Sequence, residues 1–247
     1  MYQTRKVTST NAHSWCSALE EGPSALYAET LQGKCYWGMF QECPSLKKAP
    51  VIKAVKIHSG EEHCSYMFDG CTSLETVQDV LFAKETNIFP KICEGMFSGC
   101  TSLKKAPALP SIDLQTGCYH GMFQGCTSLT EVPESLPATK LYGSCYENMF
   151  YGCTNLKIAP KLPAETLASS CYSSMFRDCS SLTEVWLYAK EYSGALDMYT
   201  FMGCPPTGVT AHIRKDCDYN SNVYSLQQPQ WTYLDIETGE PITNFLW

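Results

Sequence analysis

Charge is scarce in this sequence, and neither sign is concentrated in a run. Charged residues make up 17% of the 247 residues, below the quarter or so that is usual for soluble domains. Lysines and arginines never stand more than two in a row, as in Lys47-Lys48, and the net charge is −7. Nucleic-acid binding needs a basic stripe or patch. We therefore expect no nucleic-acid partner.

Long apolar runs and an export signal are also missing. No stretch of 18 apolar residues occurs, so we expect no membrane span. The first ten residues contain no apolar segment of the kind that a secretory signal peptide has. Two explanations fit: either the protein does not use that export route, or the chain is a mature or excised piece of a longer protein.

A repeated phrase fills most of the chain. A Met-Phe pair is followed by a cysteine three residues after the phenylalanine and by a leucine three residues later, as in Met149, Phe150, Cys153 and Leu156. The phrase occurs six times, and a seventh copy lacks the methionine. Its phenylalanines recur every 25 to 29 residues, at Phe40, Phe68, Phe97, Phe123, Phe150, Phe176 and Phe201. Self-similarity at this period predicts a solenoid, in which each unit buries its apolar face against its neighbours.

The pattern within one unit predicts both strand and helix. Cys145, Met149 and Cys153 recur every four residues, which favours a short helix with one apolar stripe. Pro160 and Pro163 then limit strand pairing to short segments. We therefore predict an α/β fold: a right-handed solenoid of about seven coils, with short parallel strands on one face and short helices on the other.

Both ends depart from the repeat. Residues 1–15 resemble no other part of the chain and are expected to form an N-terminal cap, whereas the solenoid is expected to span residues 16–204. Alternating apolar residues near 209–213 and 231–236 predict a strand-rich C-terminal cap over residues 205–247. Two units, after Leu74 and Leu182, replace the proline corner with an apolar, strand-like run.

Fifteen cysteines could indicate a disulfide scaffold, but most of them occupy two repeat positions, one on each side of the Met-Phe pair. In a helix the two cysteines of one unit would lie about 10–12 Å apart, too far for a disulfide. Bridges between neighbouring coils stay open, because stacked strands lie about 4.8 Å apart. We expect mainly free, buried thiols. Single cysteines spread along an axis do not suit zinc, so no metal or other cofactor is expected.

Residues of catalytic type do not combine into a site. Cys217 stands between Asp216 and Asp218, where neighbouring carboxylates make a thiol a poor nucleophile. His58 and His63 are interpreted as part of a solvated loop rather than a metal site. We therefore expect no enzymatic activity. A column of tyrosines could be a sugar-stacking platform, but we expect it to cover the flank of the helices with its hydroxyls in water: Tyr36, Tyr119, Tyr146 and Tyr172.

The phrase Met-Phe-x-Gly-Cys-Thr-Ser-Leu, followed by Ala-Pro-x-Leu-Pro-Ala-x-x-Leu, resembles the BspA-type leucine-rich repeat family of bacterial surface proteins, which also occurs in phage and protist chains. The resemblance covers residues 16–204. It implies a leucine-rich-repeat solenoid, a place at the cell surface or outside the cell, and adhesion or protein–protein recognition without catalytic residues. An excised fragment or a phage particle is the other possible setting.

Two functions follow from these expectations. The first is a non-catalytic recognition module that binds a protein or surface glycan through its solenoid face. The alternative is a structural protein, such as a phage decoration or fibre component or a self-associating subunit. The candidate surface consists of the residue pairs after each inward leucine, although these pairs could also be merely a solvated face: Lys47, Lys48, Glu75, Thr76, Lys104, Lys105, Thr130, Glu131, Lys157, Ile158, Thr183 and Glu184.

Overall fold

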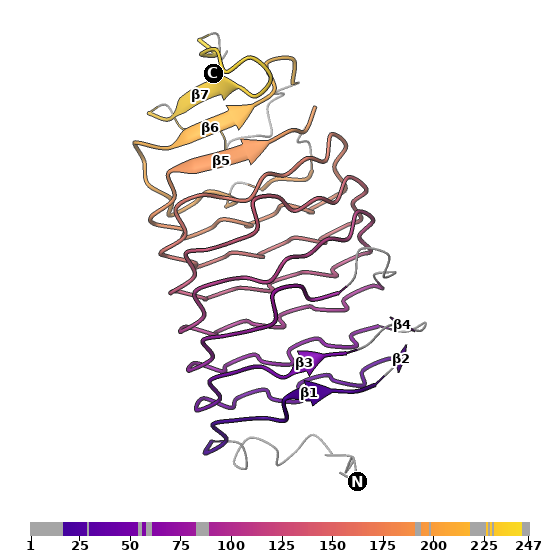
Figure 1. Ribbon diagram of the computed structural model, residues 1–247. Helices are drawn as coiled ribbons and strands as arrows, with labels where there is room; N and C mark the ends of the chain where they lie inside the picture. The colour runs from indigo at the N-terminus through magenta and orange to yellow at the C-terminus, as the bar shows by residue number, and fades with distance from the viewer. Residues whose placement is uncertain are drawn as a thin grey trace.

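The computed structural model describes residues 17–28, 30–53, 56–57, 61–82, 89–190, 194–197, 199–217, 226, 228 and 230–243. In these ranges the chain winds into a stack of coils that leads from the N-terminal end to a three-stranded sheet near the C-terminus (Figure 1). The predicted cap over residues 1–15 lies outside the described residues, as does His58.

Short parallel strands line one wall of the stack, as predicted. β1 (Ala25–Leu26) pairs with β3 (Val51–Ile52), and β2 (Thr30–Leu31) pairs with β4 (Lys56–Ile57). Through the middle coils, pairing is reduced to single parallel bridges. Pairing of equivalent residues in successive coils is what a solenoid requires.

Prolines explain why the middle coils have bridges instead of strands. Pro107, Pro133 and Pro160 each stand two residues after a bridging residue. Proline has no N–H to donate, so the ladder cannot extend through it. After Leu182 the proline is absent, and β5 (Glu184–Leu187) reaches four residues.

The unit after Leu74 has neither the proline nor a longer strand, and a side chain replaces part of the backbone pairing there. Gln78 occupies the place of the proline, and its Oε1 accepts a hydrogen bond from the N–H of Ile52 at 2.7 Å. Its Nε2 donates to the carbonyls of Val80 and Leu81, both at 2.7 Å. The Gln78 amide thus stands in for the backbone pairing that a longer strand would supply.

The wall that we predicted to be helical consists of turns. Among the described residues there is no α-helix, and hence none of the length and apolar character needed to cross a membrane. Ser144, Asn148 and Gly152 have φ angles of 56°, 56° and 73°. These values lie in the left-handed region, which a right-handed helix cannot contain. The helix prediction was therefore wrong.

Hydrogen bonding in this turn wall alternates along the chain. The N–H of Met149 closes a turn by donating to the carbonyl of Tyr146 at 3.1 Å, whereas the N–H of Phe150 donates to Met175 of the next coil at 2.9 Å. Each turn advances four residues, and two of the four side chains point inward. Cys145 and Cys153 therefore share the buried side with Met149. A period of four arises here without a helix.

The core is built of columns that run from coil to coil. Seven phenylalanine rings stack with centroids 5.5 to 5.8 Å apart and planes within 9° of parallel. In the interior coils the methionine, leucine and both cysteine columns are buried as well, in agreement with the repeat pattern. In the first coil Met39 is 38% exposed and Cys35 is exposed, because no described segment covers their outer side.

The C-terminal segment closes the stack with a regular sheet. β5, β6 (Thr210–Ile213) and β7 (Thr232–Asp235) pair in parallel in that order, so the two alternating segments that we expected to be strands form β6 and β7. The chain then reverses, and Pro241 bridges Leu234 in antiparallel fashion. Trp231 meets the last phenylalanine of the column, Phe201, edge to face, at 5.4 Å and 76°.

Candidate binding surface

In every repeat, two consecutive residues on the strand wall point their side chains outward. We call each such pair of residues a step. Each step lies between an inward leucine and an inward alanine or valine, as Lys157 and Ile158 lie between Leu156 and Ala159. Leu156 is fully buried and Ala159 is 3% exposed, whereas Lys157 and Ile158 are exposed, Ile158 by 55%. The steps therefore present side chains to solvent without contributing to the core.

In three of the coils, one carbonyl holds the two-residue step of the next coil. The Lys104 carbonyl accepts hydrogen bonds from the N–H groups of Thr130 and Glu131, both at 3.0 Å. The carbonyls of Lys47 and Lys157 accept the corresponding pairs of N–H groups in their next coils. This repeated contact places the steps beside one another, so their side chains form two adjacent columns that we call the strand-face columns.

Nearly all of the predicted surface residues are exposed, and only Glu184 is half-buried. Bridges place Lys48 beside Thr76, Lys105 beside Glu131 and Ile158 beside Glu184. The structure thus brings the predicted residues together on one wall: Lys47, Lys48, Glu75, Thr76, Lys104, Lys105, Thr130, Glu131, Lys157, Ile158, Thr183 and Glu184.

The lysines on this wall differ in whether a nearby carboxylate neutralises their charge. Lys47 pairs with Glu20 at 3.1 Å and Lys105 with Asp79 at 3.0 Å. The hydrogen bond to Asp79 raises the pKa of Lys105, which therefore stays charged at neutral pH. Lys104 and Lys157 form no ion pair within the described part of the chain. Their charges are available to a partner.

Sequence reasoning missed the continuation of this wall onto the C-terminal sheet. The rings of Trp186 on β5 and His212 on β6 stack with centroids 3.5 Å apart and planes 3° from parallel. Lys161 Nζ lies 5.2 Å from the Trp186 centroid, and His212 Nε2 lies 2.9 Å from Glu184 Oε1. The signal was present in the alternation of residues 184–187 and 210–213, which sends Trp186 and His212 to the same face.

The tyrosine column is part of the core, which corrects both of our interpretations of it. Tyr119, Tyr146 and Tyr172 are at most 2% exposed, and their rings stack at 6.0 and 6.1 Å. Burial raises the pKa of each of the three phenols well above its usual value. Rings buried between coils cannot stack on a sugar, and their hydroxyls do not lie in water.

The cysteines after the Met-Phe pair have a structural contact that recurs in successive coils. The thiol of Cys126 donates to the carbonyl of Phe97 in the preceding coil at 3.1 Å, and Cys153 makes the same bond to Phe123 at 3.1 Å. Burial raises the pKa of Cys126 to about 12. A thiol of this kind is protonated at neutral pH and is not a nucleophile.

Of the two histidines that we expected in a solvated loop, the structure describes only His63, and for that residue the expectation was wrong. His63 is fully buried, and its ring centroid lies 5.9 Å from that of Phe89. Glu62 beside it pairs with Lys34 of the neighbouring coil at 2.8 Å. Across the residues that the structure describes, no three His, Cys, Asp or Glu side chains form a group that could hold a metal ion.

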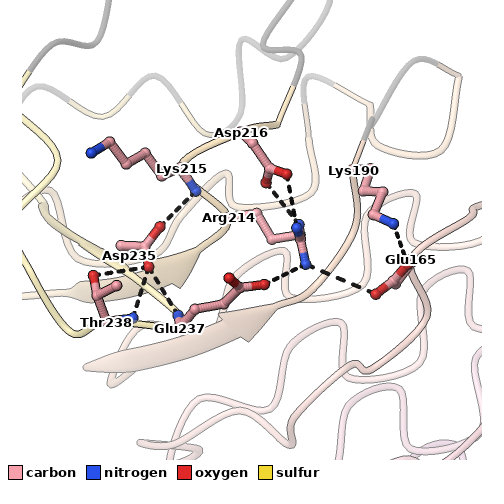
Figure 2. Close-up of polar contacts among 8 residues, drawn as sticks. All are labelled: Glu165, Lys190, Arg214, Lys215, Asp216, Asp235, Glu237 and Thr238. Carbon is pink, nitrogen blue, oxygen red and sulfur yellow. Dashed lines mark hydrogen bonds and ion pairs between the residues drawn. The ribbon is translucent and has the colours of Figure 1, made fainter.

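A cluster of charged side chains surrounds Arg214 near the C-terminal end of the stack (Figure 2). Two guanidinium nitrogens donate to the Asp216 carboxylate at 2.9 and 2.8 Å, and Nη1 donates to Glu237 at 2.8 Å. These bonds raise the pKa of Arg214. Glu165 at the edge of the cluster binds Lys190 at 2.6 Å. The charges satisfy one another, so the cluster holds the cap together.

Asp235 anchors the reversal that ends the cap, beside the Arg214 cluster in Figure 2. Its carboxylate accepts hydrogen bonds from the N–H groups of Lys215, Glu237 and Thr238 and from the Thr238 hydroxyl, at 2.8 to 3.0 Å. The bonds from Thr238 are the main cause of the lowered pKa of Asp235. A carboxylate satisfied in this way is a structural group.

Comparison with known families agrees with the coil geometry. The profile of the family described as BspA type leucine rich repeat region matches residues 34–156 and 119–217, with six copies. Together the two ranges cover more than half of the chain. No individual curated protein shows a significant match. Repeats of this family generally mediate binding to proteins or surfaces, and its members are typically non-enzymatic and surface-associated.

Proposed function

Because the chain belongs to the BspA-type leucine-rich repeat family, we propose that it is a non-catalytic recognition module that binds a protein or another macromolecule at a surface. The strand-face columns are the proposed binding surface, and the cell surface or the extracellular space is the proposed location. In this proposal the solenoid core has no role in chemistry and serves to hold the columns in place.

The observation that carries this proposal is the contrast between the two sides of the strand wall. Its inner positions hold leucine followed by alanine or valine in six coils and are buried or partly buried. The outer step between them carries lysine, glutamate, threonine or isoleucine. An outer side chain can therefore change without disturbing the core, which is how solenoids vary a binding surface.

Charge reversal on the strand-face columns tests the proposal. We expect the combined Lys104→Glu, Lys105→Glu and Lys157→Glu variant to bind its partner about tenfold more weakly or worse, because charged partners are steered and held by complementary charge. Its thermal midpoint should change little, because all three side chains are exposed. Affinity is measured by surface plasmon resonance against the strongest binder found in a panel of immobilised extracellular proteins and glycans.

The matched control reverses three exposed lysines outside the columns, Lys53, Lys140 and Lys215, of which only Lys140 has an ion pair with another described residue. This control has the same change in net charge and should retain the affinity of the unmodified protein. Added salt should lower the affinity of the unmodified protein for its partner, so that it approaches the affinity of the column variant. Equal affinity of the column variant and the unmodified protein would place the binding surface elsewhere.

A second candidate function, self-assembly, is favoured by the first coil. Trp37 is 43% and Met39 is 38% exposed, although later equivalents of Met39 are buried. Exposed apolar side chains that lie together can mark a surface at which another chain packs. The mass of the protein in solution separates the two candidates.

A further inference from the structure

The sequence contains only three arginines, and the two that the structure describes are used differently. Arg214 is bound by the carboxylates of Asp216 and Glu237. The guanidinium of Arg177 makes no hydrogen bond with any described residue, and its Nε is buried without a partner. Oδ2 of Asp178 lies 3.8 Å from that Nε, which is an ion pair but is too long for a hydrogen bond. The hydrogen-bond donors of Arg177 are therefore not used by any described residue.

Two tyrosines hold this guanidinium in place. Cζ of Arg177 lies 5.3 Å from the ring centroid of Tyr151 and 5.1 Å from that of Tyr199. Tyr151 belongs to the preceding coil, and Tyr199 belongs to the following one. Cation–π contacts with two rings restrict the rotamers of a long side chain before any ligand arrives. A group ordered in advance loses less entropy on binding.

Part of the guanidinium stays accessible to a ligand. Its Cζ lies over both tyrosine rings, and the side chain is still 32% exposed. The Nη groups form a planar fork that matches the two oxygens of a carboxylate. A doubly charged phosphate would favour further cations, but the aligned positions in the coils on either side hold Tyr151 and Met202 rather than lysines. One arginine beside Asp178 suits a singly charged carboxylate.

The surroundings of this fork resemble an interaction hot spot. Tyr199 and Met202 are each 41% exposed next to Arg177. Tyrosine and arginine are the residue types that most often carry binding energy at interfaces, and methionine is enriched there. We propose that Arg177, clamped by Tyr151 and Tyr199, is a docking point for a glutamate or aspartate carboxylate of an acidic protein segment. The proposal rests on the recognition function above and adds a contact on the turn wall.

The test uses the full chain and a fluorescein-labelled peptide of four Gly-Glu repeats, with a Gly-Gln peptide as the uncharged comparison. Fluorescence anisotropy at low salt should detect binding of the glutamate peptide only. Arg177→Lys keeps the charge but loses the planar fork, and we expect it to weaken binding about tenfold. Replacing both Tyr151 and Tyr199 with leucine should weaken binding comparably while Arg177 remains.

The Lys53→Glu and Lys140→Glu variant is the matched control, because both lysines are exposed and lie outside the docking point and outside the strand-face columns. It should bind the glutamate peptide as the unmodified protein does. The column variant is tested against a different ligand, so a failure of this docking point is distinguishable from a failure of the strand-face proposal. Unchanged affinity in Arg177→Lys, or equal binding of the Gly-Gln peptide, overturns the docking point. Competition by inorganic sulfate as strong as that by the glutamate peptide overturns the choice of a carboxylate.

Discussion

At the scale of the residue, cysteine suits its column because it combines two properties. It is small and apolar enough for a fully buried site, and its thiol can still donate a weak hydrogen bond. In six successive coils the thiol three residues after the column phenylalanine donates to the phenylalanine carbonyl of the preceding coil at 3.0 to 3.2 Å. Cys64, Cys93, Cys118, Cys145 and Cys171 of the other column are free, buried thiols.

These buried thiols predict a protein that loses stability in alkali. Burial raises the pKa of Cys126, Cys171 and Cys204 to about 12. In the unfolded chain the pKa of a cysteine is about 8.5. At a pH below the thiol pKa of the unfolded chain, the thiols are protonated in both the folded and the unfolded state, and the folded protein keeps its full stability. Above that pKa the unfolded state loses protons first, so each thiol should lower the free energy of unfolding by about 1.4 kcal/mol per pH unit.

The measurement is the thermal midpoint from pH 6 to pH 10, in the presence of reductant. We expect a plateau up to about pH 8 and a steep fall beyond it. Thiol titration in denaturant without reductant should find about ten or more free sulfhydryls, as expected for a protein that is not a disulfide scaffold. A midpoint that stays level to pH 10, or mostly oxidised cysteines, would contradict this interpretation.

At the scale of the element, the turn wall requires left-handed backbone at every fourth residue. In successive coils Gly99, Gly125 and Gly152 occupy one such position, with φ of 69°, 72° and 73°. A Cβ added at Gly125 would lie 3.8 Å from the backbone of Gly99, which is ordinary contact. The requirement for glycine at this position is therefore set by the backbone conformation rather than by space.

Two glycine substitutions should have opposite effects. Gly125→Ala should lower the free energy of unfolding by about 1–2 kcal/mol, because alanine is strained at positive φ. Gly143→Ala is the matched control: Gly143 does not have positive φ, and its added Cβ would lie 3.5 Å from the nearest atom, the Ser169 carbonyl oxygen. It should leave stability unchanged or raise it by up to about 1 kcal/mol. Urea unfolding measures both, and equal effects would refute the argument.

At the scale of the whole molecule, the two ends of the phenylalanine column differ. Trp231 covers Phe201 at the C-terminal end, and its Nε1 donates to the Pro205 carbonyl at 3.0 Å. At the other end Phe40 is buried, but Trp37 and Met39 beside it are exposed. Each coil depends on its neighbours, so in the self-assembly proposal a second chain would add at these exposed side chains.

The recognition proposal predicts a monomer of 27.6 kDa in solution. Light scattering coupled to size exclusion measures the mass at several protein concentrations. If a larger symmetric assembly forms instead, replacing Trp37 and Met39 with lysine should dissociate it, because charged side chains at the contact oppose pairing. An assembly that is dispersed in this way would favour the structural role over recognition.

The sequence by itself determined the inward columns and the repeat. Phenylalanine, leucine and cysteine recur at constant offsets within each unit, and such offsets show which side chains share the interior whatever backbone connects them. The same offsets placed the outward steps, because Lys157 and Ile158 stand between two inward residues. The last two strands, β6 and β7, were also visible, because the period-two alternation near 209–213 and 231–236 is typical of strands.

Only the tertiary structure decided what the offsets left ambiguous. A spacing of four fits both a helix and a run of turns, and the turns form because alternate N–H groups bond to the next coil, as Phe150 bonds to Met175. The tyrosine rings are buried because neighbouring coils cover them. The clamp on Arg177 forms because stacking brings Tyr151 and Tyr199 beside it from coils on either side. Contacts between coils depend on their exact register, which a repeat of 25 to 29 residues does not specify.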